Sequence, residues 1–195
     1  MLRTTKNMKE RYEKIQNQLF CMIPEKWDKI FLYASVIDRT GNVQTGELYF
    51  YYLPKGLLKK KPVNVYEVPN KFNIDEAIYT KLVDDLYESI KNLRQDFIDT
   101  DQKLWTNVTI SIENCTFKVE YGYEELGQDE QSNYENHVIW RYKYLGIGGE
   151  IKEERKILEK YFSNLVEPKR ETYQTGLYVK TTNNVVGFKK VENEE

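Results

Sequence analysis

Apolar side chains recur at helical spacing through residues 73–98, and no other segment limits the possible folds as strongly. The members of this stripe are Ile74, Ile78, Leu82, Leu86, Ile90, Leu93 and Phe97. Steps of three and four residues place these side chains on one face of an amphipathic helix. Asn73 is a suitable N-cap, and Glu76 stands at the third helical position. The pattern therefore predicts a long helix that packs one face against a second layer.

Two further segments have helical spacing. In residues 7–22 the apolar positions are Met8, Tyr12, Ile15 and Leu19, and Pro24 ends the helix. In residues 151–165 they are Ile157, Leu158, Tyr161 and Leu165. Residues 137–144 fit two structures, because alternate residues are apolar as in a strand, while Gly146 could close a helix at its C′ position. Both interpretations stay open, with a preference for the helix.

The remaining apolar segments predict strands joined in hairpins. Residues 30–37 and 47–53 flank turn residues 39–42, and residues 107–112 and 117–123 flank Glu113 and Asn114. In the second hairpin Asn107, Thr109 and Ser111 alternate with apolar residues, which predicts one solvated face. Residues 63–68 fit a short edge strand between prolines. Because hairpins and helices are segregated, the sequence predicts an α+β single domain, with an antiparallel sheet built from hairpins packed against amphipathic helices.

The chain of 195 residues has the size of one ordinary domain. Pro168 marks a boundary, so residues 1–166 are predicted to form the α+β domain and residues 167–195 a C-terminal extension. Within the extension, residues 175–181 and 185–190 could form a hairpin around Thr182, Asn183 and Asn184. The last four residues are predicted to be disordered.

Scarce residue types weaken the case for an enzyme. The chain has one histidine, His137, and two cysteines, Cys21 and Cys115. A single histidine excludes zinc sites that need two from one chain, and no glycine-rich phosphate loop or GxSxG motif is present. Both thiols are expected to be buried in a reducing compartment, and His137 is expected to be structural. We therefore assign no catalytic residue, no metal ligand and no cofactor.

Charge and hydropathy limit the classes of binding partner and the cellular location that the sequence leads us to expect. The net charge is −2, whereas a general nucleic-acid binder has an excess of basic residues. Lys59, Lys60 and Lys61 are expected to form a solvated loop tip rather than a phosphate site. The longest apolar run, residues 30–37, is too short to cross a membrane, and no signal peptide precedes it. A cytosolic protein without direct nucleic-acid or membrane binding is predicted.

One segment concentrates negative charge. Between Glu120 and Glu135 there are six acidic residues and no basic one, and tyrosines are interleaved with them. Runs of charge are commonly solvated surfaces, so this pattern alone does not identify a binding site.

Four strings in register resemble the YezG/EsaG type of immunity protein. They are IPEKWDKIFLY at residues 23–33, ELYFYY at 47–52, LWTNVTISI at 104–112 and WRYKYLG at 140–146. The resemblance extends over roughly residues 10–165, and the segment after Pro168 departs from it. It implies a non-catalytic antitoxin that binds the C-terminal nuclease domain of a cognate toxin and neutralises it inside the producing cell, before export by a type VII-like route.

The acidic segment offers a surface for such a partner. A nuclease site is basic because it must hold phosphates, and an inhibitor can meet it with carboxylates and aromatic anchors. The predicted partner-binding residues are Glu120, Tyr123, Glu124, Glu125, Asp129, Glu130, Tyr134 and Glu135. The three tryptophans, Trp27, Trp105 and Trp140, are expected to be core residues instead. Two alternative functions remain: a secretion chaperone that leaves its substrate active, and a nucleic-acid-binding module.

Overall fold

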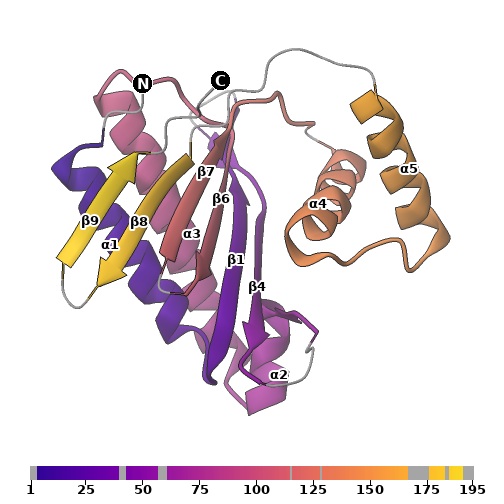
Figure 1. The fold of residues 1–195 in the computed structure, drawn as a ribbon, viewed down its shortest axis with the longest axis horizontal. Coiled ribbons are helices and arrows are strands. Elements are labelled where there is room, and N and C mark those ends of the chain that lie inside the picture. The colour runs from indigo at the N-terminus through magenta and orange to yellow at the C-terminus, as the bar shows by residue number, and fades with distance from the viewer. Residues whose placement is uncertain are drawn as a thin grey trace. The chain divides into compact units, whose positions relative to one another are not determined.

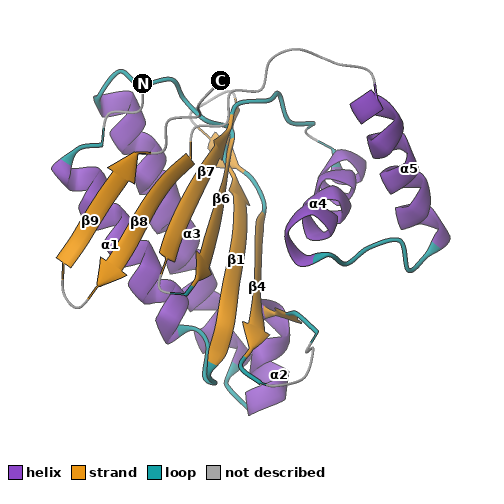
Figure 2. Cartoon of the chain, in the orientation of Figure 1, coloured by secondary structure: helices purple, strands orange, loops and turns teal. Residues whose placement is uncertain are grey.

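The computed structural model describes residues 4–39, 43–56, 61–114, 116–127, 129–166, 176–182 and 185–190. Helices and antiparallel strands occur together in this part of the chain (Figure 2), which confirms the predicted α+β class. Contacts divide the chain into two compact units, one formed by residues 1–123 and 174–195 and the other by residues 124–173.

The first unit contains an antiparallel sheet. Seven strands of the described residues follow one another in the order β5-β4-β1-β6-β7-β8-β9. Figure 1 shows this order from β4 to β9. Their bounds are β1 Trp27–Ser35, β4 Leu48–Pro54, β5 Val63–Asn64, β6 Asn107–Glu113, β7 Thr116–Gly122, β8 Gly176–Thr182 and β9 Val185–Lys190. The predicted pairing of the first two long strands is confirmed, since Leu32 of β1 lies opposite Phe50 of β4. On its other side Leu32 lies opposite Ile110 of β6, so β1 is an inner strand.

The polar face predicted for β6 is wrong at two positions. Asn107 and Thr109 are only 6% and 5% exposed, whereas the alternation with apolar residues predicted solvated side chains. Thr109 lies in register between Tyr33 of β1 and Glu120 of β7. Both neighbours have much larger side chains than threonine, which helps to explain its low exposure. Alternation along one strand gives no information about the strands beside it.

Helix α1, Lys6–Cys21, confirms the first predicted helix. It begins after Thr5, whose hydroxyl accepts a hydrogen bond from the Met8 N–H at 3.2 Å. All four positions of the predicted stripe are buried: Met8, Tyr12, Ile15 and Leu19. Cys21 is exposed, so the prediction of a buried thiol is wrong here. It lies two positions after Leu19, about 200° around the helix, and therefore points away from the core.

The long helix is α3, Glu76–Asp99, but its start differs from the prediction. Asp75 is the N-cap, and its carboxylate accepts a hydrogen bond from the Ile78 N–H at 2.9 Å. Asn73 instead closes the short helix α2, Val68–Phe72, in a left-handed conformation with φ of 53°. Asparagine suits that conformation as well as it suits an N-cap, so the sequence alone did not separate the two roles.

The buried face of α3 is rotated relative to the predicted stripe at its first turns. Ile78 and Leu82 are 64% and 38% exposed. Buried in their place are Tyr79 and Val83, one position further along the chain and about 100° around the helix. From Leu86 onward the predicted positions Leu86, Ile90, Leu93 and Phe97 are all buried.

Helices α1 and α3 lie on the same side of the sheet (Figure 1) and enclose the main core with it. Trp105 is fully buried in this core and Trp27 is half-buried; Trp140, in the second unit, is 5% exposed. The Tyr12 and Tyr121 hydroxyls form a buried hydrogen bond of 2.7 Å, which joins α1 to β7. The two buried tyrosine hydroxyls are thus paired with one another.

A two-stranded ribbon, β2 Ile37–Arg39 and β3 Val43–Thr45, lies between β1 and β4 in the chain. Arg94 of α3 is 4% exposed and donates to both carboxylate oxygens of Asp38 in β2, at 3.0 and 2.6 Å. Its Nε also donates to the Trp105 carbonyl at 2.9 Å. The buried guanidinium of Arg94 therefore connects three parts of the first unit: the ribbon, helix α3 and the segment that leads into β6.

The second unit contains helices α4, Glu130–Leu145, and α5, Lys152–Val166. Residues 137–144 are thus helical, and Gly146 ends α4 in a left-handed conformation with φ of 67°. A small core of Val138, Ile157 and Leu158 joins the helices, with Tyr134 and Ile139 packed against it. Glu154 is 7% exposed; it forms an ion pair with Arg141 and accepts a hydrogen bond from the Gly149 N–H at 3.0 Å.

Near the C-terminus, β8 pairs with β7 and β9 pairs with β8, both antiparallel. A separate role for residues 167–195 remains a prediction. Cys115, Lys59, Lys60 and the tail of residues 192–195 lie outside the described residues. Nowhere in the described ranges is a helix both long enough and apolar enough to cross a membrane.

Candidate functional site

The predicted partner-binding residues are distributed over both units. Glu120 and Tyr123 belong to the first unit, and the other six belong to the second. Glu120, in β7, is half-buried and forms an ion pair with Lys118. Tyr123 is half-buried, with the Lys103 Nζ 4.6 Å from its ring centroid, and burial raises the pKa of its hydroxyl. Both side chains thus interact with a cation of their own unit.

Asp129 has a structural role in the second unit. It is the N-cap of α4: one carboxylate oxygen accepts from the Ser132 N–H at 2.9 Å, and the other accepts from the Ser132 hydroxyl at 2.8 Å. These hydrogen bonds, the backbone one foremost, lower the pKa of Asp129. Its negative charge also lies at the positive end of the helix dipole. The Asp129 carboxylate therefore serves as the cap of α4 whether or not a partner binds.

The first turns of α4 bring three more of the predicted residues together. Glu130 is exposed in the first turn, and Tyr134 is half-buried against the small core. Glu135 accepts hydrogen bonds from Gln131 and from Lys160 of α5, both at 3.3 Å. Glu124 and Glu125, in the segment before α4, are exposed. The carboxylates best placed to meet a partner are therefore Glu124, Glu125 and Glu130.

The arrangement suits binding by charge. Across the described residues, no three side chains of the metal-ligating types come together in a way that could hold an ion. Exposed carboxylates at the start of a helix can instead attract a cationic surface, mainly by accelerating association.

Replacing Asp129 by alanine is expected to lower the melting temperature of the second unit, because the first-turn N–H of Ser132 loses its acceptor. Asp129→Ser is the matched control, since serine retains a capping oxygen. Thermal unfolding followed by circular dichroism would compare the two variants. Equal melting temperatures would contradict a capping role.

His137 is half-buried in α4, and burial is the main cause that lowers its pKa from 6.5 to about 4. The Arg141 charge adds to the decrease, and the Glu154 charge opposes it. The imidazole is consequently neutral near pH 7. This supports a structural residue rather than a proton donor at neutral pH.

We expect the free energy of unfolding to fall as the pH decreases from 6.5 to about 4. In that window the unfolded chain binds a proton at His137 that the folded chain does not bind. His137→Gln should flatten this dependence, and no other histidine is present to obscure the result. Denaturant unfolding of both proteins across the window measures the two slopes; parallel slopes would contradict a low pKa.

The structure also contains a groove that the sequence did not predict. It lies between α1 and α3, has a volume of about 460 Å³, and is lined by side chains of both helices together with Met22. Its lining includes Glu13, Gln18, Leu82 and Asp85. The sequence offers only an indirect signal, because its helical pattern places Leu82 in the buried stripe. The packing of α3 leaves this side chain exposed instead.

Comparison with known proteins identifies a family and several relatives that are similar in sequence. A family model described as "Immunity protein YezG-like" matches residues 8–159. Immunity protein YezG of Bacillus spizizenii is 32% identical over 158 residues, which are 80% of this chain and 94% of that protein. Immunity protein YezG of Bacillus subtilis is 28% identical over 155 residues, 79% of this chain and 98% of that protein. The type VII secretion system protein EsaG of Staphylococcus aureus is 29% identical over 166 residues, 80% of this chain and 94% of that protein.

Proposed function

The chain belongs to the YezG-like immunity protein family, and from that premise we propose that it binds a cognate secreted toxin and neutralises the toxin's C-terminal nuclease domain. The observation that carries this proposal is the length of the match. Residues 8–159 begin in α1, include β1 to β7 and end within α5, so both units contribute to the similarity.

In this proposal the chain acts by binding alone, in the cytosol of the producing cell, before the toxin is exported. It contributes no catalytic residue, metal or cofactor. A direct binder can block a nuclease by covering its basic, phosphate-holding surface. The scarcity of histidine and cysteine is compatible with a protein that performs no chemistry of its own.

We further propose that the acidic segment is part of the contact surface. Glu124, Glu125 and Glu130 are exposed and would attract the basic nuclease domain over several ångströms. Asp129 and Glu135 support the fold of the second unit through Ser132 and Lys160, so their contribution to binding would be indirect. Tyr134 is half-buried and offers only part of its ring to a partner.

Co-expression tests the proposal and separates it from the alternative of a secretion chaperone. The toxin domain would be expressed in a bacterial host alone, with this chain, and with an unrelated acidic protein of similar size. We expect this chain alone to restore growth and to co-purify with the toxin domain. A purified complex that retains full nuclease activity would favour the chaperone, and unchanged toxicity without co-purification would refute both functions.

A further inference from the structure

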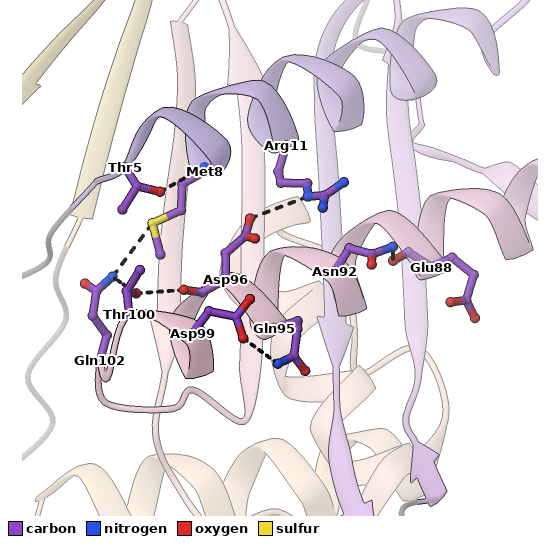
Figure 3. Close-up of polar contacts among 10 residues, drawn as sticks. All are labelled: Thr5, Met8, Arg11, Glu88, Asn92, Gln95, Asp96, Asp99, Thr100 and Gln102. Atoms are coloured by element: carbon purple, nitrogen blue, oxygen red, sulfur yellow. Dashed lines mark hydrogen bonds and ion pairs between the residues drawn. The ribbon is translucent and has the colours of Figure 1, made fainter.

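The groove between α1 and α3 is flanked by contacts between the two helices. The Tyr79 hydroxyl, near the start of α3, donates to the carbonyl of Met22, just after the end of α1, at 2.8 Å. The Arg11 Nε atom, near the start of α1, lies 3.4 Å from the Asp96 Oδ2 atom, near the end of α3. The two helices therefore run antiparallel. Figure 3 shows the Arg11 and Asp96 side chains pointing toward one another from the two helices. These contacts join the two helices on both sides of the groove.

The lining of the groove combines negative charge with apolar surface. Glu10, Glu13 and Asp85 contribute carboxylates, and Lys14 contributes the single ammonium group of the lining. Leu82 is 38% exposed although it is a large apolar side chain on a helix whose other face is buried. A partner segment that fits this lining carries both positive charge and an apolar side chain.

Lysine and arginine suit such a lining. Their side chains carry the positive charge that the carboxylates of the groove attract, at the end of an apolar stem that can pack on apolar surface.

We infer that this groove receives a lysine- or arginine-bearing segment of the toxin's nuclease domain, with an apolar side chain packed on Leu82. The inference rests on the proposed function, which supplies a basic partner. A second copy of this chain is a poorer occupant, since the same groove would bring Glu13 and Asp85 against their own copies.

The exposed thiol of Cys21 provides a direct probe, because it lines the groove. We would measure the rate of maleimide modification at Cys21, resolved by peptide mass spectrometry, with and without saturating toxin domain. The rate is expected to fall at least about tenfold in the complex, as expected for a thiol buried at an interface. Asp84→Cys in a Cys21→Ser background is the control; Asp84 is also exposed but does not line the groove, and its thiol should stay reactive.

Charge reversal gives an independent measurement. The double variant Glu13→Lys with Asp85→Lys is expected to weaken binding of the toxin domain at least about tenfold, since both carboxylates line the groove. The matched control, Glu67→Lys with Asp84→Lys, makes the same change of net charge at exposed positions outside the groove and should bind normally. Circular dichroism would verify that both variants are folded.

The outcomes distinguish this inference from the proposed function. Normal binding by the groove variant, with Cys21 equally reactive in the complex, would overturn the inference while leaving neutralisation intact. Protection of Cys21 in the free protein, together with a dimer in sedimentation, would overturn it in favour of a second copy. Failure of the unmodified chain to bind the toxin domain would overturn the proposed function and the inference together.

Discussion

Replacing Trp105 by alanine is expected to lower the free energy of unfolding by about 3–5 kcal/mol. Trp105 is fully buried, and its ring packs against Phe97 at 6.2 Å and against Tyr121 at 5.5 Å between centroids. The guanidinium of Arg94 lies 5.9 Å from the same ring. The substitution removes contacts with all three side chains and leaves a cavity that the surrounding helix and strand can fill only in part.

Trp105→Phe is the control that separates packing from hydrogen bonding. The indole Nε1 has no hydrogen-bond partner among the described residues, so phenylalanine loses no hydrogen bond and retains an aromatic ring. Removal of an unpaired buried donor offsets part of the lost volume. We expect this variant to lose less than about 2 kcal/mol in denaturant unfolding. Similar losses for both variants would contradict a role based on packing.

Reversing Glu124, Glu125 and Glu130 to lysine is expected to slow association with the toxin's nuclease domain by roughly 10- to 100-fold at low ionic strength. All three carboxylates are exposed, so the fold should tolerate the change. Asp129 is deliberately left unchanged because it caps α4. Stopped-flow mixing would measure the association rate, and the difference should shrink as salt is added.

A control variant with the same net charge isolates the position of the charges. Asp28, Glu67 and Asp84 are exposed carboxylates of the first unit and can also be reversed to lysine. This variant should associate almost as fast as the unmodified chain. If both variants are slowed equally, only the overall charge matters, and the acidic segment has no special part in the interface.

Local patterns predicted the elements of the fold well. The long helix, the first helix and the β6–β7 hairpin follow from spacing and turn chemistry, which depend only on near neighbours. For residues 137–144, Gly146 was the local signal that favoured a helix over a strand. It ends α4 with a positive φ, a conformation that glycine adopts readily. Aromatic burial at Trp105 also followed from residue type alone.

Features that depend on distant neighbours could not be predicted in the same way. The exposure of Ile78 and Leu82 depends on how α3 is rotated against the sheet, and the burial of Thr109 depends on Tyr33 in the next strand. The groove beside α1 exists because two helices far apart in sequence pack together. The acidic segment was visible as composition, but the sequence did not show that Asp129 is used as a helix cap.

The most direct test of neutralisation is a titration of the purified toxin nuclease domain with this chain, with cleavage of a nucleic-acid substrate as the readout. We expect the cleavage rate to fall in proportion to the added chain and to approach zero at an equimolar ratio. An unrelated acidic protein should have no effect in the same range. Full nuclease activity in a stoichiometric complex would contradict the proposal that binding neutralises the toxin.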